Sequence, residues 1–302
     1  FGREDTYARL ASVIGFCTPE QVLDVCYQIV AIQRDFGNRQ DRKLSRFKYT
    51  IDKYSLEWFK HELNTRLGFD LAAIRPFEFT TTGDRFGWSE TADGLWHLGL
   101  RLEYGRILDT ESQKLKTALL EIARLNLCTF RMTGNQNLVL VNVKPEYKVV
   151  IDGFLNKYGY APDASHLSGL RRNSIACVAL STCPQAMAEA ERYLPELITK
   201  LEGSLDKYGL RQEEIKIRMT GCPNGCGRSV LGEIGLIGKS PGRYNLYLGA
   251  SFNGDRLNTL YRENQDEKAI LAILDGLFES FAHTRRDKEA FGDFVQRTIL
   301  SA

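Results

Sequence analysis

Four cysteines in the second half of the sequence have the spacing of a metal or cluster site. Five residues separate Cys177 from Cys183, and three separate Cys222 from Cys226. Each pair lies at or just after the end of a segment predicted to be a strand, so two neighbouring loops could bring four thiolates together. The thiolate, rather than the thiol, is the form of cysteine that ligates metals.

Spacing alone leaves three interpretations of these cysteines open. Structural zinc prefers short spacings in both pairs, and a gap of five residues is unusual for it. Buried or disulfide-bonded cysteines are the second interpretation, and Cys17, Cys26 and Cys128 are predicted to be ordinary core residues because they lie in apolar segments. An iron–sulfur cluster is favoured, because ligation by four thiolates is its usual mode.

The residues beside the cysteines would suit an anionic cluster. The glycines at 221, 225 and 227 allow positive φ angles, and Pro223 restricts one turn dihedral, so backbone N–H groups of this loop can point at sulfur. Cys183 stands immediately before Pro184, which predicts the start of a helix. The positive end of such a helix would stabilise a thiolate.

The composition is that of a globular protein with no disulfide framework. The chain has 302 residues, a net charge of +2, 43% hydrophobic and 26% charged residues, and an odd number of cysteines, seven. The balanced charge gives no electrostatic footprint for nucleic acid or an anionic membrane, and no apolar run reaches the roughly 18 residues of a membrane span. We therefore expect no nucleic-acid or membrane partner and a reducing, cytoplasmic location. The first residue is Phe1, so we expect a fragment or a processed product.

Hydrophobic periodicity and cap residues predict a mixed α/β chain that positions these cysteines. The predicted helices span 18–37, 55–68 and 115–126, with one from 145, a long one from 184 that Pro195 kinks or divides, and one over 265–283. The predicted strands span 77–82, 95–102, 129–133, 138–143, 175–180, 215–220 and 244–248, and a basic loop spans 37–50. We place domains at 1–89 (the second part of an α/β domain that contains the basic loop), 90–163 (a ferredoxin-like half-repeat) and 164–302 (an α/β domain for cluster and cofactor).

One short internal repeat is visible. The segments 131–137 and 218–224 share Arg-Met-Thr-Gly at their first four positions and Asn at the last, each in a strand followed by a loop. A repeat of only seven residues can arise either from duplication of a domain or from coincidental similarity of two strand ends.

The cysteine segments resemble the paired motifs of the siroheme-containing sulfite and nitrite reductases. The resemblance is carried by Ala-Cys-Val-Ala-Leu-Ser-Thr-Cys-Pro at 176–184 and Thr-Gly-Cys-Pro-Asn-Gly-Cys-Gly-Arg at 220–228. Within that family it is strongest to the haemoprotein (beta) subunits of assimilatory NADPH-dependent sulfite reductases, through Arg-Pro-Phe-Glu-Phe-Thr at 75–80, Gly-Arg-Ile-Leu-Asp at 105–109 and Pro-Gly-Arg-Tyr-Asn-Leu at 241–246. It implies an α/β fold with mixed sheets, the C-terminal half of a duplicated fold.

The resemblance also implies roles for individual residues. The four cysteines would hold a 4Fe-4S cluster, and Cys226 would in addition be the axial ligand of the siroheme iron. Asn224 would contact siroheme, although a turn-forming role is as plausible for it. The remaining implied cofactor contacts are Arg46 and Lys48, facing siroheme carboxylates unless the basic loop is simply solvated, and Arg131, Asn135 and Gln136, with Asn137, at a second polar loop.

The implied reaction is the six-electron reduction of sulfite to sulfide, in sulfate assimilation and cysteine biosynthesis. In the family, the cations that face sulfite come from a half of the protein that precedes the segment seen here. The implied electron donor is a flavoprotein (alpha) subunit that carries FAD and FMN and uses NADPH, with ferredoxin as another possible donor. The alternatives are a siroheme nitrite reductase and a non-catalytic four-cysteine module for electron transfer or metal binding.

Overall fold

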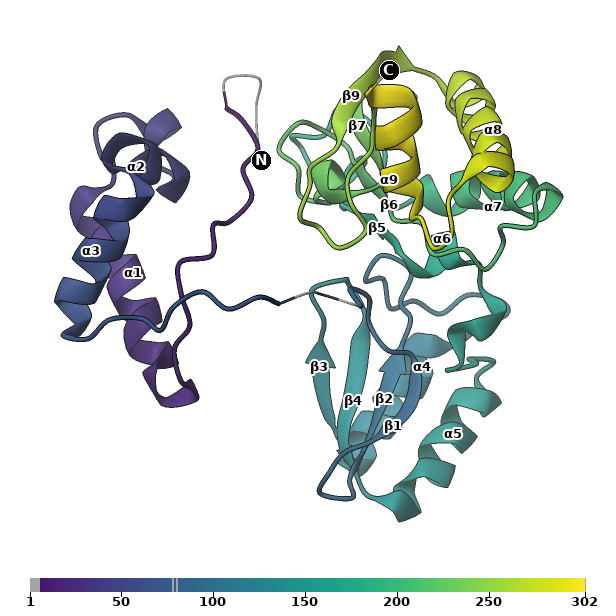
Figure 1. Ribbon diagram of the computed structural model, residues 1–302. Coiled ribbons are helices and arrows are strands. Elements are labelled where there is room, and N and C mark those ends of the chain that lie inside the picture. The colour runs from purple at the N-terminus through teal and green to yellow at the C-terminus, as the bar shows by residue number, and fades with distance from the viewer. Residues whose placement is uncertain (1–5, 78, 80, 302) are drawn as a thin grey trace. The chain divides into compact units, whose positions relative to one another are not determined.

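The structure is a computed structural model that describes residues 6–77, 79 and 81–301. The chain forms two compact units, Phe1–Thr80 and Thr81–Ala302. Figure 1 shows helices in the first unit and two sheets with their helices in the second. The division into domains at 1–89, 90–163 and 164–302 stays a prediction.

The first unit is a small helical body. Its elements are the 3₁₀ turns Pro19–Gln21 and Arg42–Leu44 and the helices α1 (Val22–Phe36), α2 (Phe47–Tyr54) and α3 (Leu56–Leu67). The helices predicted from 18 and from 55 are confirmed, together with their capping residues. Ser55 Oγ accepts a hydrogen bond from Trp58 N, and Gly68 ends α3 in the left-handed conformation.

The predicted basic loop is wrong over its second half, where α2 begins. Thr50 and Ile51 are buried on one face of this helix, and Phe47 packs edge-on against Phe59 with ring centroids 5.1 Å apart. The cations of this stretch hid an apolar face that recurs every three to four residues. Lys48 is therefore a helical residue.

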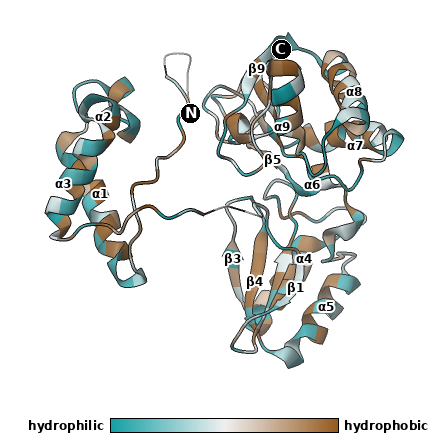
Figure 2. Ribbon diagram, viewed as in Figure 1, coloured by the Kyte–Doolittle hydropathy of each residue, from teal (hydrophilic) through white to brown (hydrophobic). Residues whose placement is uncertain are grey.

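The second unit begins with an antiparallel sheet. Its strands are β1 (Gly87–Glu90), β2 (Trp96–Leu100), β3 (Thr129–Met132) and β4 (Leu138–Val143), in the order β1-β2-β4-β3. The helices α4 (Leu115–Leu125) and α5 (Lys148–Lys157), the second preceded by the turn Pro145–Tyr147, pack on it. Figure 2 shows β4 largely in the colour of apolar residues, and its side chains Leu138, Leu140 and Val143 are buried in the core.

The strand predicted at 77–82 is not formed at its described residues. Phe77, Phe79, Thr81 and Thr82 have no strand conformation, and both phenylalanine side chains are exposed. Glu78 and Thr80 lie outside the described residues. Alternation of apolar residues marks a strand only where a neighbouring strand pairs with it.

The second sheet carries the cysteines. Its strands are β5 (Ser174–Ala176), β6 (Ile217–Thr220), β7 (Ile234–Ser240), β8 (Arg243–Leu248) and β9 (Thr259–Gln265), in sequential order. β5, β6 and β7 are parallel neighbours, whereas β8 and β9 continue the sheet antiparallel. The mixed α/β fold class is confirmed, while β1, β7 and β9 were not predicted.

Helices and turns complete this part of the unit. They are Ala164–His166, α6 (Gly169–Arg172), α7 (Leu194–Lys207), Ser229–Leu231, α8 (Glu267–Thr284), α9 (Phe291–Val295) and a π-helical turn Gln296–Leu300. Side chains of α7 and α8 share one buried core with the strands, including Leu197, Ile217, Leu246 and Phe278. Among the described residues, no helix combines the length and apolar character that crossing a lipid bilayer requires.

The long helix predicted from Pro184 is wrong. α7 begins only at Leu194, and Pro195 lies in its first turn, where proline is well tolerated and produces no kink. Residues 184–193 run instead as irregular chain alongside the cysteine loops, and Ala188 N donates to Gly221 O at 3.0 Å. Consequently no helix begins at Cys183, and a helix dipole does not stabilise its thiolate.

Candidate functional site

Two neighbouring parallel strands deliver the cysteine loops to the same edge of the sheet. Ala176 at the end of β5 lies opposite Met219 in β6. Cys177 follows β5 directly, and Cys222 follows β6 after one residue. Because the carboxyl ends of parallel neighbours meet at one edge, both loops leave the sheet side by side.

Short backbone contacts join the two loops. Gly221 N donates to Cys177 Sγ at 3.3 Å, and Gly221 O accepts from Met187 N at 2.8 Å. A Cβ atom added to Gly221 would lie 2.6 Å from Ala179 Cβ, and one added to Gly227 would lie 2.3 Å from Met219 O. These positions admit only glycine, since real Cβ atoms do not approach other atoms so closely.

The four cysteines differ in burial. Cys222 is buried with 7% exposure, Cys177 and Cys183 are half-buried, and Cys226 is exposed. Burial raises the pKa of the Cys177 thiol, the N–H groups of Gly221 and Ala179 offset part of the rise, and the nearby charges of Cys226 and Cys222 add to it. The thiol of Cys177 thus lies in a site where a metal centre, rather than water, would stabilise the thiolate.

All seven cysteines are free thiols, so the disulfide interpretation is wrong. Among the described residues, no three Cys, His, Asp or Glu side chains converge as the ligands of one metal ion do. In a 4Fe-4S cluster each cysteine ligates a different iron, so the geometry that matters is that of the two loops.

The other three cysteines are not uniformly core residues. Cys128 is half-buried, and burial raises the pKa of its thiol to about 11, while Cys17 is also half-buried. The prediction is wrong for Cys26, which is exposed on α1. Val25 and Ile32 of the same helix are buried, and Cys26, one residue after Val25, is turned about 100° away from that face.

Polar side chains predicted to contact the cofactor hold the loops in place. Asn224 Nδ2 donates to Gln185 Oε1 at 2.7 Å, which links the second cysteine loop to the first. Gln136 pairs with the backbone of Ala176, since Nε2 donates to Ala176 O at 2.7 Å and Oε1 accepts from Ala176 N at 3.3 Å. Asn135 Nδ2 donates to Asp84 Oδ1 at 3.1 Å. In this structure these amides organise the backbone next to the cysteines.

Asn137 and Arg131 complete the predicted second loop. Asn137 is buried, and its side chain donates to Asp84 Oδ2 at 2.7 Å and accepts from Leu102 N at 2.9 Å. Arg131 lies exposed on β3, and within the described residues its side chain has no hydrogen bond or ion pair.

Arg46 and Lys48 belong to the first unit. Lys48 Nζ donates to Thr6 Oγ1 at 2.6 Å and lies 4.2 Å from the centre of the Tyr7 ring. Arg46 precedes the first turn of α2. A cavity of about 690 Å³ in the same unit is lined by Asn38, Arg39 and Lys53 among others, but not by Arg46 or Lys48.

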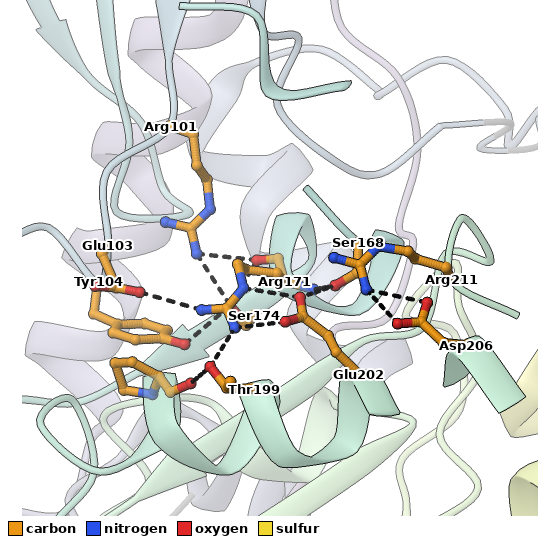
Figure 3. A network of polar contacts seen from close by, with 11 residues as sticks. Arg101, Glu103, Tyr104, Ser168, Arg171, Ser174, Thr199, Glu202, Asp206 and Arg211 are labelled. Atoms are coloured by element: carbon orange, nitrogen blue, oxygen red, sulfur yellow. Dashed lines mark hydrogen bonds and ion pairs between the residues drawn. The ribbon is translucent and has the colours of Figure 1, made fainter. Parts of the chain in front are cut away.

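A network of polar contacts fixes the start of β5 (Figure 3). Arg171 Nε and Nη2 donate to the two carboxylate oxygens of Glu202 at 2.9 Å each, and Ser168 Oγ donates to the same carboxylate at 2.7 Å. Arg101 Nη2 bonds Arg171 O and Ser174 Oγ, both at 3.0 Å. Burial favours a higher pKa for Glu202, but the bonds from Arg171 and Ser168 outweigh it and leave the pKa lowered. The network thus anchors the strand that leads into Cys177.

A cavity of about 600 Å³ opens beside this network. Arg101, Arg106 and Arg171 line it together with Glu191, and Arg106 Nε donates to Glu191 Oε1 at 2.8 Å. Glu191 N in turn donates to Cys177 O at 3.1 Å. None of the predicted site residues lines this cavity.

Sequence analysis missed a group of cations next to the second cysteine loop. Arg218 lies on β6 and is buried, Lys216 immediately precedes that strand, and Arg228 follows Cys226 by two residues. Arg228 Nη2 donates to Gly134 O at 2.5 Å and to Asn135 Oδ1 at 3.3 Å, so the loops after the two Arg-Met-Thr-Gly segments touch. A signal existed, because Lys216 and Arg218 interrupt an otherwise apolar strand.

Comparisons with known proteins identify two matching domains. Residues 1–71 match the family described as nitrite and sulphite reductase 4Fe-4S domain, and residues 89–157 match the nitrite/sulfite reductase ferredoxin-like half domain. The first match contains Cys17 and Cys26 but none of the four paired cysteines. Its description therefore does not locate a cluster in residues 1–71.

Similar proteins cover nearly the whole chain. The sulfite reductase [NADPH] hemoprotein beta-component of Anoxybacillus flavithermus is 56% identical over 98% of this chain and 52% of its own length. That of Paenibacillus sp. is 54% identical over 98% of this chain and 51% of its length. The chain thus spans about half the length of these curated relatives. The solved structure of the Mycobacterium tuberculosis NirA protein has a TM-score of 0.79 at 24% identity and covers 95% of this chain and 54% of that one, which shows a shared fold.

Proposed function

The chain belongs to the nitrite and sulfite reductase family, and from this premise we propose that it is the cluster-binding and siroheme-binding part of a sulfite reductase hemoprotein. The cofactors of such a protein are a 4Fe-4S cluster and siroheme. The proposed reaction reduces sulfite with six electrons and six protons to sulfide and three water molecules. The observation that carries the proposal is the pairing of two cysteine loops at the carboxyl ends of β5 and β6, joined by the contact of Gly221 N with Cys177 Sγ.

The described residues fit these groups. Cys177, Cys183, Cys222 and Cys226 would hold the cluster, and Gly221 N would keep donating to the Cys177 sulfur. Backbone N–H groups that point at sulfur stabilise a cluster's negative charge. Arg218 is a buried cation with unpartnered N–H groups beside the second loop, as the binding of a multiply anionic cofactor requires.

Cys226 is the proposed link between the two cofactors. Its side chain is exposed, in contrast to Cys222, and glycines stand on both sides of it. An exposed thiolate flanked by residues without side chains can approach a large macrocycle. When bound, siroheme would supply the iron at which sulfite is reduced, and the cluster would supply electrons to it.

We propose that several polar and charged side chains shape the cofactor pocket. They are Asn224, Gln136, Asn135, Arg131, Arg46 and Lys48. The bond of Gln136 to Ala176 fixes the residue before Cys177, and that of Asn224 to Gln185 joins the loops. These contacts limit the motion of the sulfurs, which favours fast electron transfer because less reorganisation is needed.

The proposed electron donor is a flavoprotein (alpha) subunit that carries FAD and FMN and takes electrons from NADPH. The names of the curated relatives, which contain both NADPH and beta-component, support such a partner. We also propose a cytoplasmic location, because NADPH is a reductant of that compartment.

The experiment is an ultraviolet–visible spectrum with an iron and acid-labile sulfide count on the purified protein. We expect haem-type bands and about five irons per chain, four from the cluster and one from siroheme. Cys226→Ser is expected to lose the coupling of the two cofactors and at least about tenfold in sulfite reduction. Cys26→Ser, a change at an exposed cysteine on α1, is the matched control and should leave both unchanged.

A colourless protein with one zinc per chain would contradict the proposal. Cluster absorption without haem-type bands would instead support the non-catalytic electron-transfer module. Faster turnover of nitrite than of sulfite by the same preparation would reassign the substrate within the family.

A further inference from the structure

Arg218 is a buried guanidinium without a counter-charge. Its side chain is 8% exposed, and its Nε and Nη1 atoms are buried with no hydrogen-bond partner. In the described part of the chain, it forms neither a hydrogen bond nor an ion pair. Leaving a charge unpaired inside a protein is strongly destabilising, so a partner for this group is expected in the functional state.

The surroundings of Arg218 add positive charge. Burial is the main cause that lowers the pKa of Arg218 to about 10, and Arg228 lowers it further. Lys216 has its pKa lowered to about 8 by burial and then by Arg218. We call Lys216, Arg218 and Arg228 the cation cluster.

The cation cluster bonds only neutral groups among the described residues. Lys216 Nζ donates to the Thr82 hydroxyl and to Phe252 O, and Arg228 donates to Gly134 O and Asn135 Oδ1. The charges of Glu233 and Glu214 act on Lys216 without a hydrogen bond to its ammonium group, and the Glu233 carboxylate accepts instead from two backbone amides, Lys216 N and Gly292 N. A ligand that completes this site must therefore be an anion.

The cluster lies next to the second cysteine loop. Ile217 and Met219 of β6 point into the helix-covered core, so Arg218 and Thr220 point to the other face of the sheet. Arg218 precedes Cys222 by four residues, a span of at most about 14 Å along the backbone, and Arg228 follows Cys226 by two residues, a span of at most about 7 Å. Arg228, through which the cation cluster reaches the second cysteine loop, is thus close enough to contact a group bound at Cys226.

We infer that Arg218, with Arg228 beside it, binds a carboxylate on the rim of siroheme. This inference rests on the proposed function, in which Cys226 ligates the siroheme iron. Siroheme carries many carboxylates around its ring, and guanidinium–carboxylate bonds are among the strongest charge-assisted hydrogen bonds. The unused N–H groups of Arg218 are donors that such a carboxylate would satisfy. Arg218 would thus be a siroheme-binding residue and not a catalytic one.

The test compares siroheme retention with the stability of the siroheme-free protein. In Arg218→Met, siroheme is expected to dissociate about 10- to 100-fold faster, as followed by loss of haem-type absorbance in the presence of excess competing apoprotein. The iron and sulfide of the cluster should be unchanged. The siroheme-free variant should unfold at the same or a higher temperature than the siroheme-free unaltered protein, because an unpaired buried charge has been removed.

Two further variants keep the test interpretable. Arg218→Lys retains the charge and should restore part of the retention. Arg262→Met removes an exposed arginine of β9 that donates to the carbonyl of its neighbour Tyr261 and lies over the same residue's ring, and it should not alter retention.

Each possible result of the retention test either supports or contradicts the inference. Equal siroheme retention by Arg218→Met and the unaltered protein would overturn it while leaving the proposed function intact. Equal retention with a less stable siroheme-free variant would place the partner of Arg218 in the polypeptide instead. Absence of siroheme from the unaltered protein would contradict the proposed function itself, and this inference with it.

Discussion

At the scale of single residues, the close approach of the two cysteine loops depends on two glycines. Gly221 and Gly227 have no side chain, and the atoms around them occupy the space that one would need. The loop after β6 can therefore press its backbone against the loop after β5, and one of its amides reaches the Cys177 sulfur. The chemistry resides in the cysteines, but the glycines determine their separation.

Gly227→Ala is the residue-scale prediction. The new Cβ would meet Met219 O at 2.3 Å, a main-chain atom in a paired strand that cannot move freely. We expect a loss of about 2 kcal/mol or more in the free energy of unfolding, measured by urea denaturation, and a reduced cluster content. Gly203→Ala on α7, where no atom lies within 4 Å, is the control and should be neutral or slightly stabilising. Equal stability of the two variants would show that the loops can separate without cost.

At the scale of elements, β5 is a short strand whose position depends on its neighbours. Only Ser174–Ala176 pair with β6, and the polar network of Arg101, Arg171 and Glu202 holds the residues just before them. Gln136 holds the other end through Ala176. A cysteine that follows so short a strand is positioned by side chains from three distant segments.

Substitutions in the Arg171–Glu202 pair test how much this polar network contributes to stability. Arg171→Met leaves the carboxylate of Glu202, of which 12% is exposed, with the Ser168 hydroxyl as its one hydrogen-bond donor among the described residues. We expect a loss of about 3 kcal/mol in the free energy of unfolding, because a partly buried charge loses its partner. The double variant Arg171→Met with Glu202→Leu should lose less than the sum of the single changes, in a double-mutant cycle. Additive losses would mean that the pair contributes no coupling.

At the scale of the whole molecule, the chain consists of a helical unit and a second unit built on two sheets. The five-stranded sheet carries all four paired cysteines on one edge, and its inner face packs on α7 and α8. The helical unit has a core of its own, formed by Ile32, Ile51, Phe59 and Leu63. Glu233, which immediately precedes β7, is entirely buried and accepts hydrogen bonds from two backbone amides, Lys216 N and Gly292 N.

The pH dependence of global stability follows from Glu233. Burial raises its pKa to about 7 against the bonds from Lys216 N and Gly292 N and the charge of Lys216, and Asp293 adds to the rise. Between pH 4.5 and 7 the folded protein retains a proton that the unfolded chain has lost. The contribution of this group to stability is therefore present below that range and declines as the pH rises through it, by at most about 3 kcal/mol.

The variant Glu233→Gln tests the sign of this pH dependence. The stability of the unaltered protein relative to Glu233→Gln should decrease from pH 4.5 to pH 7 in urea unfolding. Glu267→Gln is the comparison of opposite sign, because the bond from Lys200 is the main cause that lowers the pKa of Glu267, and its contribution is lost as the pH falls. A constant difference between the unaltered protein and Glu233→Gln would contradict the raised pKa.

Local patterns determined much of this protein from its sequence. Capping residues placed the helices from 18 and 55, the apolar run at 138–143 placed β4, and the cysteine segments indicated the family. Each of these features depends on residues that lie within a few positions of one another, so it can be recognised from a single segment of the sequence. The basic stretch at 37–50 was misread because its cations hid the apolar face of α2, and the helix expected from Pro184 did not form because contacts with the second cysteine loop outweighed the local signal.

Only the tertiary structure determined which groups the site brings together. It placed Gln136 and Asn135 in hydrogen bonds that hold the backbone, revealed Glu202 as the anchor of Arg171, and left Arg218 buried with no partner among the described residues. The paired side chains are separated by 31 to 51 residues in the sequence. Burial and pairing are properties of the whole fold, because they depend on which atoms exclude water from a group, and the sequence around that group does not contain those atoms.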